Sequence, residues 1–271
     1  MTDVPVLAID GPGGSGKGTI AFKIATARNW HILDSGALYR AFSFAADQNG
    51  VSPGDTRALQ ALFRTIVIQF KISSGSELRV QVNGTDVTEQ IRSAEGGVLA
   101  SKYASVPTVR NCLLSRQRQE RKAPGLVADG RDMGTVVFPD ATLKIYLTAS
   151  IRVRAERRYK QLKGKGFDVN LARIEQEVSD RDDKDSSRAV SPMRPAEDSI
   201  LVDTSDLRIA EVVKKIDSLL EDSLELIPDS DSTSSDHRLV TWHRKSTAHQ
   251  GPDCVDRNSL PTTYLWNLIP G

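Results

Sequence analysis

A glycine-rich segment follows the first apolar run of the chain. Residues 6–9 read VLAI, and after Asp10 the sequence continues as GPGGSGKGT, with five glycines and one lysine in nine residues. The apolar run predicts a buried strand, and IAFKIATA at residues 20–27 predicts a helix. A strand, a glycine turn, a lysine and a helix in this order predict a phosphate-binding loop, because backbone N–H groups and a helix N-terminus attract anions.

The spacing within this segment points to a nucleoside triphosphate. Gly11, Gly16 and Lys17 match the pattern G-x-x-x-x-G-K. The pattern continues with Ser or Thr, which binds Mg²⁺, but residue 18 is glycine and the hydroxyl comes one place later. We therefore expect Mg²⁺ to be held mainly by phosphate oxygens and water. The expected ATP-binding residues of the loop are Gly11, Pro12, Gly13, Gly14, Ser15, Gly16, Lys17, Gly18 and Thr19.

Short apolar runs alternate with helical patterns along most of the chain. Helices are predicted at residues 106–122, 151–163 and about 207–224. Strands separated by helices predict an α/β fold with a parallel sheet. The apolar runs that we interpret as its buried strands are residues 6–9, 31–34, 126–129, 143–147 and 200–203.

One stretch departs from this alternation. Within residues 66–87, apolar side chains recur at every second position in two runs, and turn signals stand at SSGS and NG. A period of two with such turns predicts antiparallel hairpin strands. We interpret residues 66–92 as part of a small subdomain inserted into the α/β core.

The C-terminal segment, residues 226–271, has neither a helical nor a strand period. It contains PDSDSTSSD and three of the four histidines of the chain. We predict a disordered or non-native extension, and the alternative is a folded functional module. The scattered histidines do not form a metal-binding pattern.

Charge and cysteine content limit the classes of partner. The chain has 36 basic and 35 acidic side chains and a net charge of +1, so we expect no nucleic-acid or membrane partner. Cys112 and Cys254 form neither a disulfide framework nor a zinc pattern. No apolar run is long enough to span a bilayer, and we expect a cytoplasmic monomer.

Arginines stand near several short motifs. Taken alone, the helical clusters among them indicate solvated faces with local ion pairs. Beside a phosphate loop they indicate a second phosphate, because a guanidinium pairs bidentately with phosphate. A second phosphate could accept a phosphoryl group from the nucleoside triphosphate. Because this acceptor is already ionised near neutral pH, phosphoryl transfer to it needs alignment and charge neutralisation rather than a base. The arginines are Arg40 in LDSGALYR, Arg110 in VPTVR, Arg131 in ADGRDMG, and Arg181 and Arg188 in RDDKDSSR.

Four strings together resemble cytidylate kinases of the bacterial type: IDGPGGSGKGT, LDSGALYR, LVADGRDMGTVVFPDA and RDDKDSSRAVSP. The resemblance runs from about residue 4 to about residue 224. It implies a nucleoside monophosphate kinase domain at 1–225, with a five-stranded parallel sheet flanked by helices. A monophosphate-binding insert at about 36–105 and a short lid at about 154–170 are also implied. The implied reaction transfers the γ-phosphoryl group of ATP, with Mg²⁺, to CMP or dCMP.

The resemblance also implies roles for individual residues. Lys17 would bind the donor phosphates, and Arg157 and Arg158 would contact the donor from the lid. The catalytic group would comprise Lys17, Arg131, Arg181 and Arg188. Three residues would bind the CMP phosphate: Arg40, Arg131 and Arg181. Asp185, with Arg181, would contact the ribose. The cytosine would be contacted by Ser101, Arg110 and Asp132, with Ser35 close by, and Arg188 would also belong to the substrate-binding group.

Several residues have two interpretations. Asp132 can accept from the amino group of cytosine, or it can cap a helix that begins after a strand. Asp129 can orient Mg²⁺ through water, or it can bond to loop amides. Tyr39 can border the base or belong to the core. Rival functions are a kinase for a hydroxyl acceptor with Asp34 as base, and a non-catalytic nucleotide sensor.

Overall fold

The computed structural model describes residues 4–72, 78–164 and 166–226. The predicted C-terminal extension, apart from Leu226, lies outside the described residues, and so does the SSGS turn. In chain order, the elements are β1 Val6–Asp10, α1 Lys17–Arg28, β2 His31–Asp34, α2 Ser35–Gln48, α3 Thr56–Thr65, β3 Ile68–Ile72, β4 Leu78–Val82, β5 Thr85–Asp86, α4 Thr88–Arg92, α5 Ala94–Ala104, α6 Pro107–Arg118, β6 Leu126–Asp129, the π-helix η1 Met133–Val137, β7 Leu143–Thr148, α7 Ile151–Gly164, α8 Leu171–Ser186, β8 Ile200–Asp203 and α9 Ile209–Glu225.

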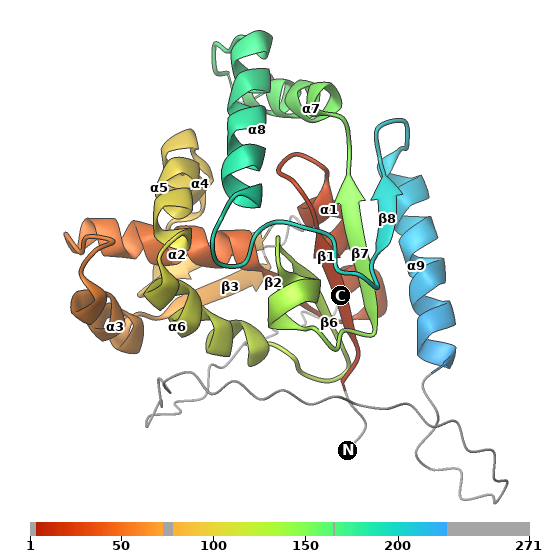
Figure 1. The fold of residues 1–271 in the computed structure, drawn as a ribbon, viewed down its shortest axis with the longest axis horizontal. Coiled ribbons are helices and arrows are strands. Elements are labelled where there is room, and N and C mark those ends of the chain that lie inside the picture. The colour runs from red at the N-terminus through yellow and green to blue at the C-terminus, as the bar shows by residue number, and fades with distance from the viewer. Residues whose placement is uncertain (1–3, 73–77, 165, 227–271) are drawn as a thin grey trace, which may run out of the picture.

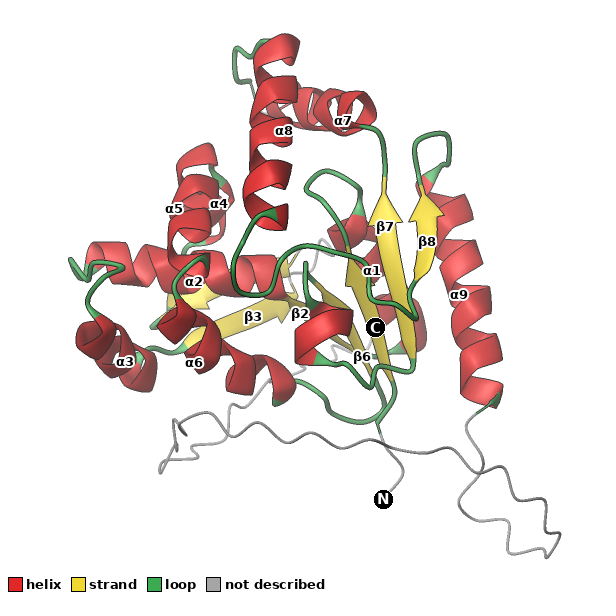
Figure 2. Ribbon diagram, viewed as in Figure 1, coloured by secondary structure: helices red, strands yellow, loops and turns green. Residues whose placement is uncertain are grey.

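Five strands form the central sheet, in the order β2-β6-β1-β7-β8. Every neighbouring pair in it is parallel. The predicted α/β fold with a five-stranded parallel sheet is confirmed, and all five apolar runs are strands of it (Figures 1 and 2). Because the strands are parallel, their carboxyl ends meet at one edge, where ligands of such sheets bind.

Alternate side chains of the sheet enter two separate cores. Leu7 and Ile9 of β1 pack with α1 and α9 on one face, around buried residues such as Ile24 and Ile216. Val6 and Ala8 point to the opposite face, where they pack with the core that α2 and α6 share with the small sheet. Helices therefore cover both faces, and functional side chains are left to the edge where the strands end.

The insert between α2 and α6 contains the predicted antiparallel strands. Strands β3, β4 and β5 form a three-stranded antiparallel sheet. Asn83 and Gly84 have φ values of 50° and 84°, as the predicted NG turn between strands requires. The antiparallel strands are followed by the short helix α4 at residues 88–92, which also belongs to the insert. There Thr88 Oγ1 accepts from the Val80 backbone N–H and ties the helix to β4.

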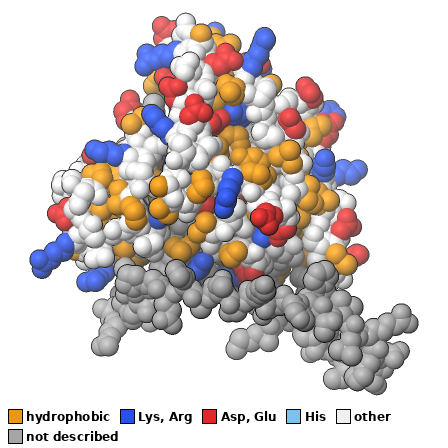
Figure 3. All heavy atoms as spheres, viewed as in Figure 1, with side chains coloured by type: hydrophobic (Ala, Val, Ile, Leu, Met, Phe, Trp, Pro, Cys, Tyr) orange, Lys and Arg blue, Asp and Glu red, His pale blue; other side chains and the backbone are white. Residues whose placement is uncertain are grey.

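Helices α7 and α8 stand above the carboxyl ends of β1 and β7 (Figure 1). They pack on each other through a small core of their own, formed by Ala155, Ile174 and Val178. None of the helices in the described ranges is long and apolar enough to cross a membrane. On the face seen in Figure 3, acidic and basic side chains are interspersed, which agrees with a net charge of +1.

Candidate active site

The glycine-rich loop connects β1 to α1 at the carboxyl edge of the sheet. Gly11 has φ +141°, and a Cβ at this position would lie 2.0 Å from the carbonyl oxygen of Leu147, so only glycine lets the loop pass this close to β7. Gly16 is the N-cap of α1 with φ 95°, and it offers no side chain to the first N–H groups of the helix. These N–H groups remain for an anionic ligand.

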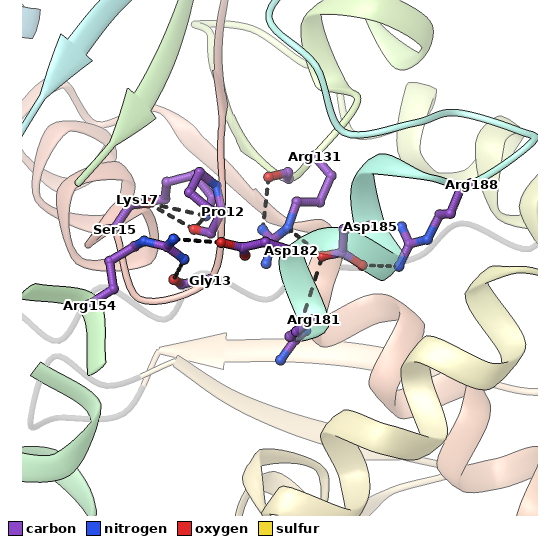
Figure 4. Close-up of polar contacts among 11 residues, drawn as sticks. Pro12, Gly13, Ser15, Lys17, Arg131, Arg154, Arg181, Asp182, Asp185 and Arg188 are labelled. Atoms are coloured by element: carbon purple, nitrogen blue, oxygen red, sulfur yellow. Dashed lines mark hydrogen bonds and ion pairs between the residues drawn. The ribbon is translucent and has the colours of Figure 1, made fainter. Parts of the chain in front are cut away.

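Lys17 lies buried beneath this loop, with 5% of its surface exposed. Its ammonium group donates to the carbonyl oxygen of Pro12 at 2.8 Å and lies 3.5 Å from Ser15 Oγ (Figure 4). Burial, followed by the positive charge of Arg131, lowers the pKa of Lys17 to about 7. A phosphate beside it would favour the charged form, so the site is suited to an anion.

Arginines from three separate segments converge next to the loop. Arg40 comes from α2, Arg131 follows β6, and Arg181 lies on α8. A Cβ built on Gly97 would lie 3.6 Å from Arg40 Nη2 and 3.7 Å from Arg181 Nη1, so these two guanidinium groups meet over α5. Burial, followed by the charges of Arg131 and Arg40, lowers the pKa of Arg181 to about 10. Burial likewise lowers the pKa of Arg40. The crowding of cations predicts a dianionic ligand between them.

Asp185 forms the centre of the arginine cluster on α8. It is 1% exposed, and its Oδ2 accepts from Arg131 Nε at 3.1 Å. Arg188 donates to the other carboxylate oxygen, and Arg181 Nε lies 4.0 Å from Oδ2. The helix ends at Ser186, so Arg188 reaches Asp185 from beyond the end of the helix.

Asp132 and Arg110 form a buried ion pair, and both line one pocket together with Asp185 and Arg188. Both side chains are 7% exposed, and Arg110 Nη2 donates to Asp132 Oδ2. Arg110 also donates to the carbonyl oxygen of Ala104 at 3.0 Å and lies over the ring of Tyr39, 5.5 Å from its centroid. The capping interpretation of Asp132 was wrong: this residue precedes η1, but its side chain makes no capping hydrogen bond.

The remaining predicted substrate residues line the same pocket. Ser35 and Ser101 border it, together with Tyr39, and the Ser35 hydroxyl lies 3.4 Å from Gln117 Oε1. Tyr39 belongs to the core and to the pocket wall at once, and burial raises its pKa to about 12. The pocket is lined by Ser35, Gly36, Tyr39, Arg40, Ala100, Ser101, Ala104, Arg110, Gly130, Arg131, Asp132, Arg181, Asp185 and Arg188.

The two predicted donor-side arginines of α7 have different surroundings. Arg157 Nη1 donates to the carbonyl oxygen of Ser15 at 3.3 Å and to Thr204 Oγ1 at 3.1 Å, so its guanidinium holds the loop. Arg158 lies near Arg40 and Arg181, and its positive charge lowers the pKa of both. The donor role of both residues stays a prediction.

Carboxylates also end the strands beside the loop. Asp34 Oδ1 accepts from the Ala37 backbone N–H at 2.8 Å and caps α2. Asp129 Oδ2 lies 3.3 Å from the position of a Cβ on Gly18, and burial, opposed in part by Lys17, raises the pKa of Asp129 to about 7. Within the described ranges, no group of three His, Cys, Asp or Glu side chains is arranged to hold a metal ion.

The arrangement brings two cationic sites together. Arg131 Nη2 lies 3.6 Å from the position of a Cβ on Gly13 in the loop, while its Nε bonds to Asp185 in the pocket. Arg131 thus lies where the two sites join. Chemically, the site can hold two phosphorylated ligands end to end, with a guanidinium at the junction.

Comparison with known proteins assigns the chain to a family. The model of the cytidylate kinase family matches residues 7–222. The chain belongs to the cytidylate kinase family. The cytidylate kinase of Stutzerimonas stutzeri is 52% identical to it over 220 residues, which cover 81% of this chain and 96% of the relative. The cytidylate kinase of Nitrosococcus oceani is 49% identical over 216 residues, with 79% and 95% covered.

Among solved structures, the similarity is weaker. A gluconokinase from Sinorhizobium meliloti has a TM-score of 0.43 and 14% identity, covering 83% of this chain and 96% of its own. A shikimate kinase from Acinetobacter baumannii in complex with shikimate has a TM-score of 0.39 and 17% identity, covering 81% and 94%. Similarity at this level does not bear on the substrate of a cytidylate kinase family member.

Sequence reasoning missed several residues that shape the site of this family member. Asp10 bonds to η1, Gln117 contacts Ser35, and Asp182 pairs with Arg154 beside the loop. Asp10 is the last residue of β1 and directly precedes the glycine loop, and this position is the signal in the sequence that could have identified it. Gln117 and Asp182 carry no local signal, because their partners come from distant parts of the chain.

Proposed function

We propose that this enzyme transfers the γ-phosphoryl group of ATP to CMP or dCMP, giving ADP and CDP or dCDP. The observation that carries the proposal is the junction at Arg131, which joins the phosphate loop to a pocket with more arginines than carboxylates. The pocket walls contain five arginines and two aspartates, so a dianionic phosphate would balance most of the excess charge.

In this mechanism, the loop N–H groups and Lys17 bind the donor phosphates. Arg40, Arg131 and Arg181 hold the phosphate of CMP with one oxygen directed at the donor. That oxygen is already ionised near neutral pH, so the chain needs to supply alignment and charge neutralisation and no base. Asp34, the base of a hydroxyl-acceptor mechanism, is used instead as the cap of α2.

Asp132 and Arg110 would read the base. A carboxylate accepts from the N4 amino group of cytosine, and a guanidinium donates to N3 and O2. Uracil would place an oxygen against Asp132 and leave a buried charge badly paired, which costs on the order of a few kcal/mol. Asp185, with Arg181, would contact the ribose of CMP or dCMP.

The residues present fit Mg²⁺ held mainly by phosphate oxygens and water. Gly18 supplies no hydroxyl, and the Asp129 carboxylate lies beside it, where it can orient metal-bound water. Bound Mg²⁺ would supply neutralisation of the donor phosphate charge.

A steady-state assay with ATP, Mg²⁺ and each of CMP, dCMP, UMP and AMP tests this function. We expect ADP release with CMP and dCMP and much slower release with UMP and AMP. Lys17→Ala should lower kcat by orders of magnitude with an unchanged fold. Transfer to none of the nucleotides, or near-normal turnover of Lys17→Ala, would contradict the proposal.

A further inference from the structure

The start of η1 is held by a residue from a different part of the chain. The backbone N–H groups of Met133 and Gly134 begin this π-helix, and helix starts need acceptors for such groups. The acceptor is Asp10: its Oδ1 accepts from Met133 N and its Oδ2 from Gly134 N, each at 2.8 Å. Asp10 is 5% exposed, so water does not replace these bonds at low cost.

This cap has a consequence for Asp132. Asp132 stands at the N-cap position of η1, but its side chain does not cap, because Asp10 already satisfies both following amides. Its carboxylate is left to accept from Arg110 in the pocket. Asp10 also directly precedes Gly11, so one short stretch of chain fixes both the loop and the pocket segment.

We propose that Asp10 is a positioning residue for substrate selection. By holding the backbone of Met133 and Gly134, it sets the place of Arg131 and Asp132 relative to the phosphate loop. It thereby determines how well the enzyme distinguishes CMP from UMP. The inference rests on the proposed function, in which Arg131 contacts the acceptor phosphate and Asp132 contacts the base.

Two features support a role beyond the fold. The charge of Asp10 lies near that of Asp132, which repels it, and that of Lys17, which attracts it. Burial, in spite of the two amide bonds, raises the pKa of Asp10 from 3.8 to about 6. Because the folded pKa exceeds the unfolded one, the stability contribution of this group falls as pH rises through that interval. A neutral residue at position 10 escapes this cost, so Asp10→Asn is suited to a functional test.

The test compares wild type, Asp10→Asn, Asp132→Ala and the double variant with CMP and UMP. Asparagine has one acceptor oxygen, and its amide N–H₂ would face the second backbone donor. Loss of one buried hydrogen bond is worth roughly tenfold, so KM for CMP should rise about tenfold and the CMP-to-UMP ratio of kcat/KM should fall about as much. KM for ATP should change by less than about threefold, because sites that share no partner affect one another only weakly. Asp55→Asn, at the cap of α3 away from the pocket, is the matched control and should change none of these values.

The double variant separates positioning from general stability. If Asp10 acts through Asp132, Asp10→Asn should lower the CMP-to-UMP ratio no further in the Asp132→Ala background. Additive losses of discrimination, an unchanged ratio in Asp10→Asn, or an equal rise of KM for ATP would each overturn the inference. Failure of wild type to phosphorylate CMP would instead overturn the proposed function.

Discussion

Arg154 of helix α7 bonds both to Asp182 of helix α8 and to the phosphate loop. Its Nη2 donates to Asp182 Oδ2 at 2.5 Å, and its Nη1 donates to the carbonyl oxygen of Gly13 at 3.1 Å (Figure 4). The Arg154 side chain is 4% exposed and that of Asp182 is 18% exposed. Helices α7 and α8 and the loop therefore share one buried ion pair.

Arg154→Met is expected to destabilise the fold, because it leaves the partly buried Asp182 carboxylate without its cation. Breaking such a pair costs about 3 kcal/mol, which corresponds to a fall in Tm of roughly 6–12 °C for a domain of this size. Thermal unfolding measures the change. Arg152→Met is the matched control, since Arg152 lies on the same helix in an ion pair with Glu156 and is 81% exposed. An equal fall in Tm for both variants would show that the buried pair adds nothing.

Gly97→Leu is expected to impair acceptor binding without loss of stability. A Cβ at Gly97 is accommodated 3.6 Å from Arg40 Nη2, but a longer side chain would extend between Arg40 and Arg181. Leucine favours the helix by about 0.8 kcal/mol over glycine, so Tm should not fall. We expect KM for CMP to rise about tenfold or more from loss of a charge-assisted contact, with KM for ATP unchanged.

The matched control is Gly164→Leu. Gly164 ends α7, and a Cβ there meets no atom within 4 Å. Its kinetic constants should equal those of wild type. An unchanged KM for CMP in Gly97→Leu would show that no phosphate lies between Arg40 and Arg181.

The sequence predicted those parts of the fold that depend on local pattern. The apolar runs and glycine loop were sufficient for the strands and for the phosphate site, because each signal lies within about ten residues. Asp132 shows the limit. Its position after a strand is compatible both with contact to a base and with capping of a helix. Which of the two applies depends on Asp10, which lies 122 residues earlier and takes the capping role. Helix α4 was missed because its five residues are too short for a helical period to be seen.

Asp132→Ala is expected to narrow the difference between CMP and UMP as acceptors. The carboxylate pairs with Arg110 in the pocket and is the proposed partner of the cytosine amino group. Removing it costs CMP a charge-assisted hydrogen bond and relieves the repulsion of uracil, so the ratio of kcat/KM should fall by roughly tenfold or more. Unchanged relative kcat/KM for the two nucleotides would contradict this role.

Removal of the residues after Glu225 is expected to leave activity and Tm nearly unchanged. Helix α9 ends at Glu225, and Leu226 is 82% exposed. The family match ends at residue 222, before the segment of low-complexity composition. Thermal unfolding and a CMP assay of the shortened chain check this, and a loss in either would assign the segment a structural or functional role.

Nucleotide binding near pH 8 is expected to take up protons. Burial and Arg131 lower the pKa of Lys17 from 10.5 to about 7, so between these values the folded protein binds fewer protons than the unfolded chain. Stability contributed by this group therefore rises as pH rises through that interval. Phosphates beside Lys17 favour the ammonium form and raise its pKa again, which draws a proton from solution.

Calorimetric titration with ADP in buffers of different ionisation enthalpy measures the uptake. Lys17→Arg is the control, because a guanidinium does not titrate near pH 8. Asp129, the other group that could take up a proton, is present in both proteins. Equal uptake in the two proteins would assign the proton to another group.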